Sequence, residues 1–178
     1  MKHLINLTAT IIISFCCSST VFAQADSSVI KNIKSYVLYI DSVNKLDYAQ
    51  DQGFISGITD GIIKVDGETV GGYGIYTLAN TKADTVYRIE YHENYPINTY
   101  KTYYFKHNQL VYARLELQGG KSYMERIYLR EEYYRNEKMI GSATSKDKRA
   151  GKYPGKTNII LYPDALNFLT EYVKENGR

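Results

Sequence analysis

The chain has 178 residues and a formal net charge of +3, with acidic and basic side chains mixed along its length. This length is typical of one domain with a sizeable core, and a small net charge without a basic stripe argues against nucleic acid or an anionic membrane surface as a partner. The aromatic content is unusual, with 19 tyrosines and no tryptophan. Because tyrosine favours strands and tolerates one wet end, we expect a sheet with a large half-exposed surface.

Residues 1–23 are typical of a secretory signal peptide. Lys2 and His3 precede an apolar run, and Val21 and Ala23 occupy the positions that a signal peptidase reads. The run is too short for a retained membrane helix, and no later stretch has the roughly 20 apolar residues that a bilayer span needs. We therefore expect export to the periplasm or the extracellular space, and a single mature domain over residues 24–178.

Both cysteines, Cys16 and Cys17, lie inside this leader. Cleavage after Ala23 removes them, and with them disulfides, thiolate nucleophiles and cysteine metal sites. An alternative is a cell-surface lipoprotein that keeps Cys16 as an acylated N-terminus, although bulky Phe15 stands where such a motif has a small residue.

The first element expected in the mature chain is an amphipathic helix over residues 27–46. Its apolar side chains recur at three- and four-residue steps, and Ser27 or Ser28 is a suitable cap. The stretch 47–67 contains four glycines among polar and apolar residues, which predicts an irregular connection.

From Glu68 the apolar period changes to two, and turn residues separate the alternating runs. This pattern predicts an antiparallel meander over 68–143. Its six strands are expected at roughly 68–78, 84–92, 97–106, 109–117, 122–135 and 138–143.

The last part of the chain is expected to begin with a long polar loop over 144–157 and to end in a short strand and a C-terminal helix over 163–176, with Pro163 in its first turn. The fold class predicted for the whole domain is therefore α+β. We expect the meander to carry the N-terminal and C-terminal helices packed on one face.

One hairpin pattern occurs twice. Shifted by 29 residues without a gap, "YFKHNQLV" (104–111) lies over "YYRNEKMI" (133–140), and each reads as a strand, a polar turn and the start of the next strand. The leader, the helix and these hairpins resemble uncharacterised exported proteins of Bacteroidota-type bacteria, and the hairpin tips resemble MORN-type repeats. The resemblance covers about residues 27–141 and implies a secreted, mainly antiparallel β domain. It carries over no activity and no catalytic residues.

Several catalytic motifs are matched only in part. The stretch "AGKYPGKT" (150–157) ends like a phosphate-binding loop, but Ala150 stands where such a loop has glycine and no buried strand precedes it. His92 and His107 have no metal-ligand spacing between them, and Ser56 lacks the glycine two residues earlier that a nucleophile elbow requires. We therefore expect no metal site and no cofactor.

Paired carboxylates are the remaining route to catalysis. Glu90, Glu116 and Glu125 all fall in expected strands, and two on one face would suit a hydrolase of envelope or dietary polymers. The simpler interpretation pairs them with Arg88, Arg114 and Arg126 on a solvated face. These arginines are close in sequence.

The leading hypothesis is instead a non-catalytic binding or interaction module for an unknown protein, peptide or glycan. Rigid rings mixed with charged residues are typical of recognition surfaces, and half of the strand tyrosines should face outward. The outward subset is expected among Tyr100, Tyr103, Tyr104, Tyr112, Tyr128, Tyr133 and Tyr134. The alternatives are the hydrolase above and a purely structural envelope protein, in which tyrosine pairs only stabilise the sheet.

Overall fold

The computed structural model describes residues 26–43, 53–119 and 125–176. Its elements are an N-terminal helix over residues 26–43, seven strands, and a helical C-terminal part. The strands are β1 (Phe54–Val65), β2 (Glu68–Asn80), β3 (Val86–Glu93), β4 (Asn98–Lys106), β5 (Gln109–Gln118), β6 (Arg126–Arg135) and β7 (Lys138–Lys146). The 3₁₀ helix η2 (Lys148–Lys152), the short helix α2 (Pro154–Thr157) and the long helix α3 (Leu161–Asn176) follow.

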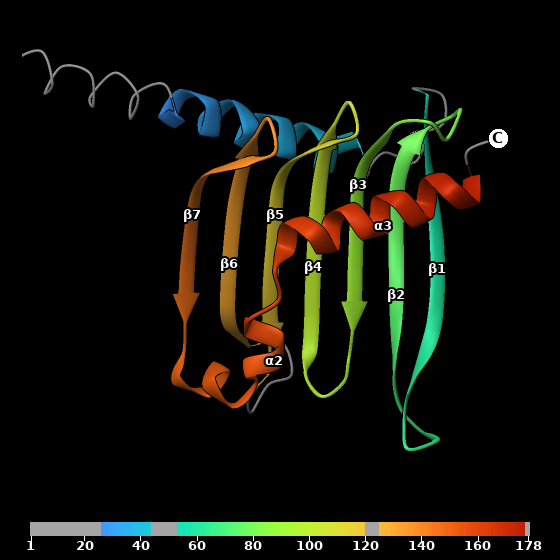
Figure 1. The fold of residues 1–178 in the computed structure, drawn as a ribbon, viewed down its shortest axis with the longest axis vertical. Coiled ribbons are helices and arrows are strands. Elements are labelled where there is room, and N and C mark those ends of the chain that lie inside the picture. Colours follow the sequence, from blue (N-terminus) through green and yellow to red (C-terminus); the bar gives the residue numbers. More distant parts are fainter. Residues whose placement is uncertain (1–25, 44–52, 120–124, 177–178) are drawn as a thin grey trace, which may run out of the picture.

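The strands form one antiparallel sheet in chain order, from β1 at one edge to β7 at the other (Figure 1). Two-residue turns with positive φ at both positions close the hairpins β1–β2, β4–β5 and β6–β7. Such turns match the right-handed twist of the strands that they join. The segments 104–111 and 133–140 adopt the same local geometry, because each register shifts two pairs before its turn, at Tyr104/Phe105 and at Tyr133/Tyr134.

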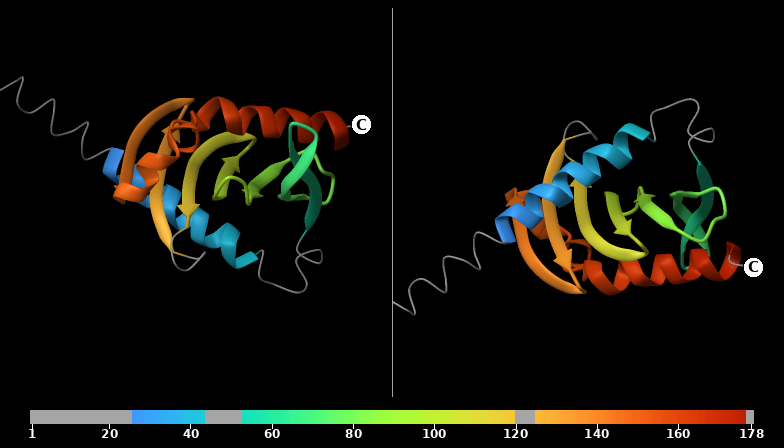
Figure 2. Two further views of the ribbon diagram at one scale, coloured as in Figure 1. Left: turned by 90° about the horizontal axis from the view of Figure 1, so that it is seen from below. Right: turned by 90° about the horizontal axis from the view of Figure 1, so that it is seen from above.

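The two long helices cover opposite faces of the sheet, as Figure 2 shows. We call these the α3 face and the N-helix face. Adjacent strand residues point to opposite faces, so Tyr103 packs in the core beneath α3 and Tyr104 in the core beneath the N-terminal helix. Strand alternation therefore builds two hydrophobic cores from one sheet.

Each core combines strand residues with one helix. The core on the α3 face includes Ile89, Tyr103, Phe105, Ala113, Leu115, Leu117, Leu161 and Ala165. The core on the N-helix face includes Ile33, Ile40, Val43, Phe54, Leu78, Tyr104, Tyr112 and Tyr133. The helix residues Ile33, Ile40 and Val43 belong to the stripe that the sequence predicts, whereas Leu46 lies outside the described residues.

The α+β class, the antiparallel meander and the two terminal helices are confirmed, but the sheet has seven strands rather than six. The additional strand is β1, where we expected an irregular connection. Gly61 is opposite Tyr73 on β2, and a Cβ at this position would meet the tyrosine ring at 2.5 Å. Glycine therefore makes room in this strand for a cross-strand aromatic ring rather than ending it.

Three further expectations need correction. The helices do not share a face, because the sheet is apolar on both sides and each side needs its own cover. The expected loop 144–157 holds the end of β7 and the helices η2 and α2. In place of a short strand, α3 itself begins at Leu161, with Pro163 in its first turn as expected. Among the described residues, no helix has the length and apolar character needed to cross a membrane.

Candidate ligand-binding hollow

The largest hollow that we describe lies on the α3 face, where the segment after β7 folds back over the sheet. It has a volume of about 600 Å³. Its lining comes from three places in the chain, namely strands β3 and β4, the loop between them, and the segment from η2 to the start of α3. The lining residues are Tyr91, Glu93, Pro96, Lys101, Lys152, Tyr153, Pro154, Gly155, Lys156 and Ile159.

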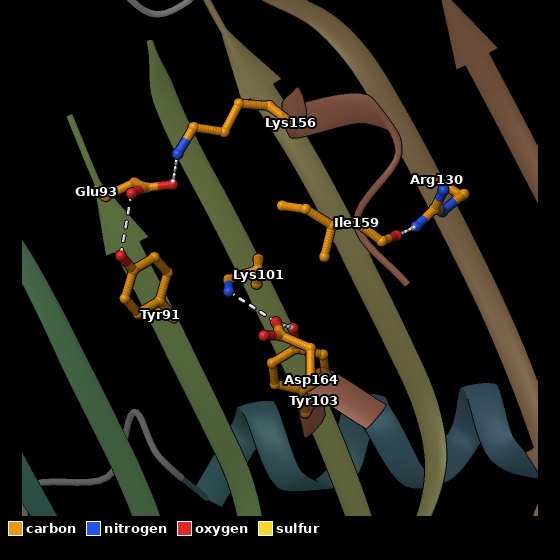
Figure 3. Close-up of polar contacts among 8 residues, drawn as sticks. All are labelled: Tyr91, Glu93, Lys101, Tyr103, Arg130, Lys156, Ile159 and Asp164. Carbon is orange, nitrogen blue, oxygen red and sulfur yellow. Dashed lines mark hydrogen bonds and ion pairs between the residues drawn. The ribbon is translucent and has the colours of Figure 1, made fainter. Parts of the chain in front are cut away.

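Lys101 lies in the floor of this hollow. It belongs to β4 on the same face as Tyr103, and only 7% of its surface is exposed. Its ammonium is 2.7 Å from Asp164 of α3 (Figure 3). It also lies 4.3 Å from the ring centre of Tyr91 and 4.9 Å from that of Phe168. A buried lysine needs such compensation, because an unpaired charge away from water is very costly.

Glu93 is the second buried charge and lies at the end of β3, with 8% of its surface exposed. Lys156 of α2 donates to its Oε1, and the Tyr91 hydroxyl donates to its Oε2 at 3.0 Å. Burial, and next to it the charge of Glu93, raises the pKa of Tyr91 above its ordinary value. Lys156 thus ties the short helix α2 to the sheet.

Arg130 of β6, which is outside the lining of the hollow, contacts the end of the segment that covers it. Its guanidinium donates to the backbone carbonyl of Thr157 at 3.1 Å and to that of Ile159. Thr157 is the last residue of α2 and Ile159 lies two residues beyond it, where a short helix leaves its last acceptors unpaired. The segment that roofs the hollow is therefore fixed to the sheet at two points, by Lys156 and by Arg130.

The lining includes three lysines, Lys101, Lys152 and Lys156, against Glu93, and Asp164 next to Lys101 supplies a second negative charge. The remaining walls are the rings of Tyr91 and Tyr153 together with proline and isoleucine side chains. This combination suits a ligand with an acidic group and an apolar or flat body. Among the described residues, no group of three histidine, cysteine or acidic side chains is placed to hold a metal ion.

Six of the seven tyrosines considered for the outward surface are buried, and Tyr100 is half-buried. Tyr103, Tyr128 and Tyr134 belong to the core of the α3 face, and Tyr104, Tyr112 and Tyr133 belong to the core of the N-helix face. Tyr100 stacks on His92, with ring centres 4.2 Å apart. Because each face is covered by a helix, strand alternation divides these rings between two cores rather than between core and water.

Several buried tyrosine hydroxyls donate to carboxylates. Tyr103 donates to Asp164, Tyr104 to Asp41 at 2.7 Å, and Tyr112 to Glu131 at 2.5 Å. Burial is the largest cause that raises the pKa of each of these tyrosines. These rings therefore stay protonated and serve as hydrogen-bond donors inside the two cores.

The three glutamates considered for catalysis are each paired with an arginine. Glu90 is 3.1 Å from Arg88, and Glu116 contacts Arg114. Both glutamates lie on the N-helix face, on strands β3 and β5. They are not directly opposite each other across β4, because the residue of β5 in register with Glu90 is Arg114.

Glu125 lies apart from the other two, just before β6. It pairs with Arg149 through two contacts of 2.7 Å, rather than with Arg126. The expected pairing partner was close in sequence, whereas Arg149 lies beyond β7 and becomes a neighbour only through the fold.

Sequence reasoning did not select Tyr91, Lys101, Tyr153 or Lys156 as site residues. The stretch "AGKYPGKT" does not form a phosphate-binding loop, because it makes parts of η2 and α2 and its Lys156 contacts Glu93. Lys101 carried a usable signal, since it shares the strand phase of buried Thr99 and Tyr103. A lysine in a core phase indicates either a buried ion pair or a site.

Comparisons with known proteins found no match for this chain, either among protein-family models, among curated proteins or among solved structures.

Proposed function

We propose that the protein is an exported, non-catalytic binding module, and that its ligand brings an acidic group into the hollow beside α3. The observation that carries this proposal is the gathering of three lysines around an open hollow with aromatic and proline walls. The volume of about 600 Å³ is in the usual range of small-molecule sites. A glycan or peptide end with a carboxylate is the ligand class that fits.

The lysines differ in how much charge they can offer. Lys101 and Lys156 already neutralise Asp164 and Glu93. Lys152 is exposed at the end of η2 and has no ion pair with any residue in the described part of the chain. An incoming acid would therefore meet Lys152 as its main partner and Lys156 as its second, with charge-assisted hydrogen bonds of the stronger kind.

The carboxylates beside the hollow support binding rather than proton transfer. Glu93 is engaged by Lys156 and Tyr91, and Asp164 by Lys101 and Tyr103. Each therefore acts as a bridge that positions a lysine. The hydroxyl that contacts each of them belongs to a tyrosine, Tyr91 or Tyr103, and donates to that carboxylate.

The experiment compares acidic probes with neutral twins of the same shape. Chemical-shift titrations with D-glucuronate against D-glucose, and with N-acetyltyrosine against its amide, separate a glycan-type from a peptide-type ligand. We expect the acids to bind, and added salt to weaken them. Lys152→Ala should weaken the acid several-fold, whereas Lys148→Ala, in the same 3₁₀ helix but outside the hollow, should not. Equal binding of acid and neutral twin, equal effects of the two variants, or no shift at the lining residues would contradict the proposal.

The structural alternative has one observation in its favour. Most of the tyrosines that we considered for recognition instead fill the two cores. If none of the four probes binds and only stability responds to substitutions in the hollow, the protein is better described as a structural envelope component.

A further inference from the structure

The two edges of the sheet differ in character. Among the described residues, β1 is paired only with β2, and β7 only with β6. The outer strand β7 exposes Met139, at 57%, near its start and Ala143 further along, but its other exposed residues are polar, namely Lys138, Ser142, Thr144, Ser145 and Lys146, and lysines are typical of a protected edge. On β1, by contrast, Ile58 and Ile62 are 68% and 60% exposed. A long edge strand with exposed apolar side chains offers free backbone groups for pairing with another strand.

The exposed stripe of β1 on the N-helix face carries alternating apolar and charged residues. Every second residue from 58 to 64 lies on this face, and all four are exposed, namely Ile58, Asp60, Ile62 and Lys64. Asp60 and Lys64 form no ion pair with any described residue. The register shift near the turn places its extra residue on β2, so the alternation of β1 itself is unbroken up to Val65.

We propose that β1 pairs antiparallel with β1 of a second copy of this chain, centred on Ile62. A two-fold axis normal to the sheet keeps each face continuous across the seam. In this register Ile62 faces Ile62 of the second copy, and Asp60 of each copy faces Lys64 of the other. Opposite charges directly across a strand pair attract, and like charges repel.

The charges select this register over its neighbours. Centring the pair on residue 60 sets Asp60 against its own copy, and centring it on residue 64 sets Lys64 against its own copy. Centring it on residue 61 sets Asp60 against Ile62 and Lys64 against Ile58. Only the register centred on Ile62 joins both charges to opposite charges and both central isoleucines to each other.

The placement of α3 leaves this segment open. Figure 1 shows the end of α3 level with the half of β1 that begins at Phe54, whereas the half that ends at the Asp66–Gly67 turn extends beyond the helix. The proposed pairing is centred on Ile62 and uses residues 59–65, all but the first of which belong to that second half. Because the two strands run antiparallel, the two copies of α3 lie near opposite ends of the paired segment.

The test measures self-association of the purified protein by sedimentation velocity over micromolar to millimolar concentrations. We expect a reversible dimer that weakens with added salt. Asp60→Lys and Lys64→Asp should each weaken the dimer about tenfold or more, since each turns two attractive pairs into two repulsive ones. The double variant should recover it, and so should an equal mixture of the two single variants, because unlike strands then face each other.

Circular dichroism of each variant confirms that the fold is retained. A protein that stays monomeric at every concentration overturns the proposal, as does a dimer that ignores both reversals. Single variants that weaken the dimer without rescue by the double variant overturn the register. The hollow beside α3 lies away from this edge, so ligand binding there succeeds or fails independently of the dimer.

Discussion

Asp164→Asn tests whether the floor of the hollow also holds α3 on the sheet. Asp164 lies in the first turn of α3 and accepts from the Lys101 ammonium at 2.7 Å and from the Tyr103 hydroxyl. Asparagine keeps the size and one acceptor oxygen but removes the charge. Lys101 then stays between the rings of Tyr91 and Phe168 without its counter-ion.

The expected loss in the free energy of unfolding is about 2 kcal/mol. Hydrogen bonds to charged groups contribute about 1.5 to 3 kcal/mol each, and a carboxylate in the first turn of a helix adds about 0.3 to 1 kcal/mol. We take the lower end, because the Asp164 side chain is 27% exposed and the amide retains part of one bond. For a chain of this length the melting temperature should fall by about 4 to 8 °C.

The measurement is urea unfolding followed by circular dichroism, since the chain has no tryptophan for fluorescence. Asp26→Asn is the matched control, because Asp26 pairs with Arg135 at 3.0 Å on the surface, where such pairs contribute about 0 to 1 kcal/mol. The triple variant Lys101→Met, Tyr103→Phe and Asp164→Leu should recover most of the loss, since it removes both charges together with the buried hydroxyl that donates to Asp164. If Asp164→Asn destabilises no more than the control, the pair does not hold the helix and our account of the floor is wrong.

Three further predictions concern the hairpins and one histidine. Glu137→Gly should stabilise the protein by about 0.5 to 1 kcal/mol, because Glu137 has a φ of 65° that glycine adopts without strain. Asn108→Ala should cost about 2 kcal/mol, since the side chain accepts from the Val86 N–H and donates to the Asp84 carbonyl, both at 2.8 Å, and its own φ is 57°. Asn108→Gly should cost less, and unfolding titrations of these three variants check both predictions. Burial lowers the pKa of His92, so the unfolded chain binds the proton more readily and stability falls as pH drops below about 6.5. His92→Phe should remove that loss, whereas His107→Asn in an exposed turn should keep it, in unfolding titrations at about pH 7.5 and about pH 5.5.

The elements with a regular local pattern could be predicted from the sequence. Period-two alternation locates β2 to β7 to within a few residues, and the three- and four-residue steps locate both long helices. The turn at His107 and Asn108 was also predictable, because polar residues between alternating runs favour a tight hairpin. These features depend on residues that are close in the chain, and such residues can be read directly from the sequence.

The features that were missed depend on contacts between distant segments. The residues near Gly61 do not indicate that the Tyr73 ring will lie over it. The glycines of β1 also interrupt the alternation by which a strand is recognised. The hollow joins β3, β4 and the segment after β7, so Lys101 and Lys156 become neighbours only through the fold. The two helices cover opposite faces because both faces of the sheet are apolar. The sequence pattern of either helix alone does not show this.

The pair Tyr103–Tyr104 shows why this chain uses tyrosine where phenylalanine would fill the same space. The two rings point to opposite faces, and each hydroxyl meets an aspartate from a different helix, Asp164 of α3 and Asp41 of the N-terminal helix. Each aspartate also receives a cation from the sheet, Lys101 in one case and Arg88 at 2.8 Å in the other. A carboxylate at a half-buried interface needs such donors, and phenylalanine would supply none. Tyr103 and Tyr104 therefore help to dock the two helices on the sheet through their aspartates, and this role requires a hydroxyl as well as a ring.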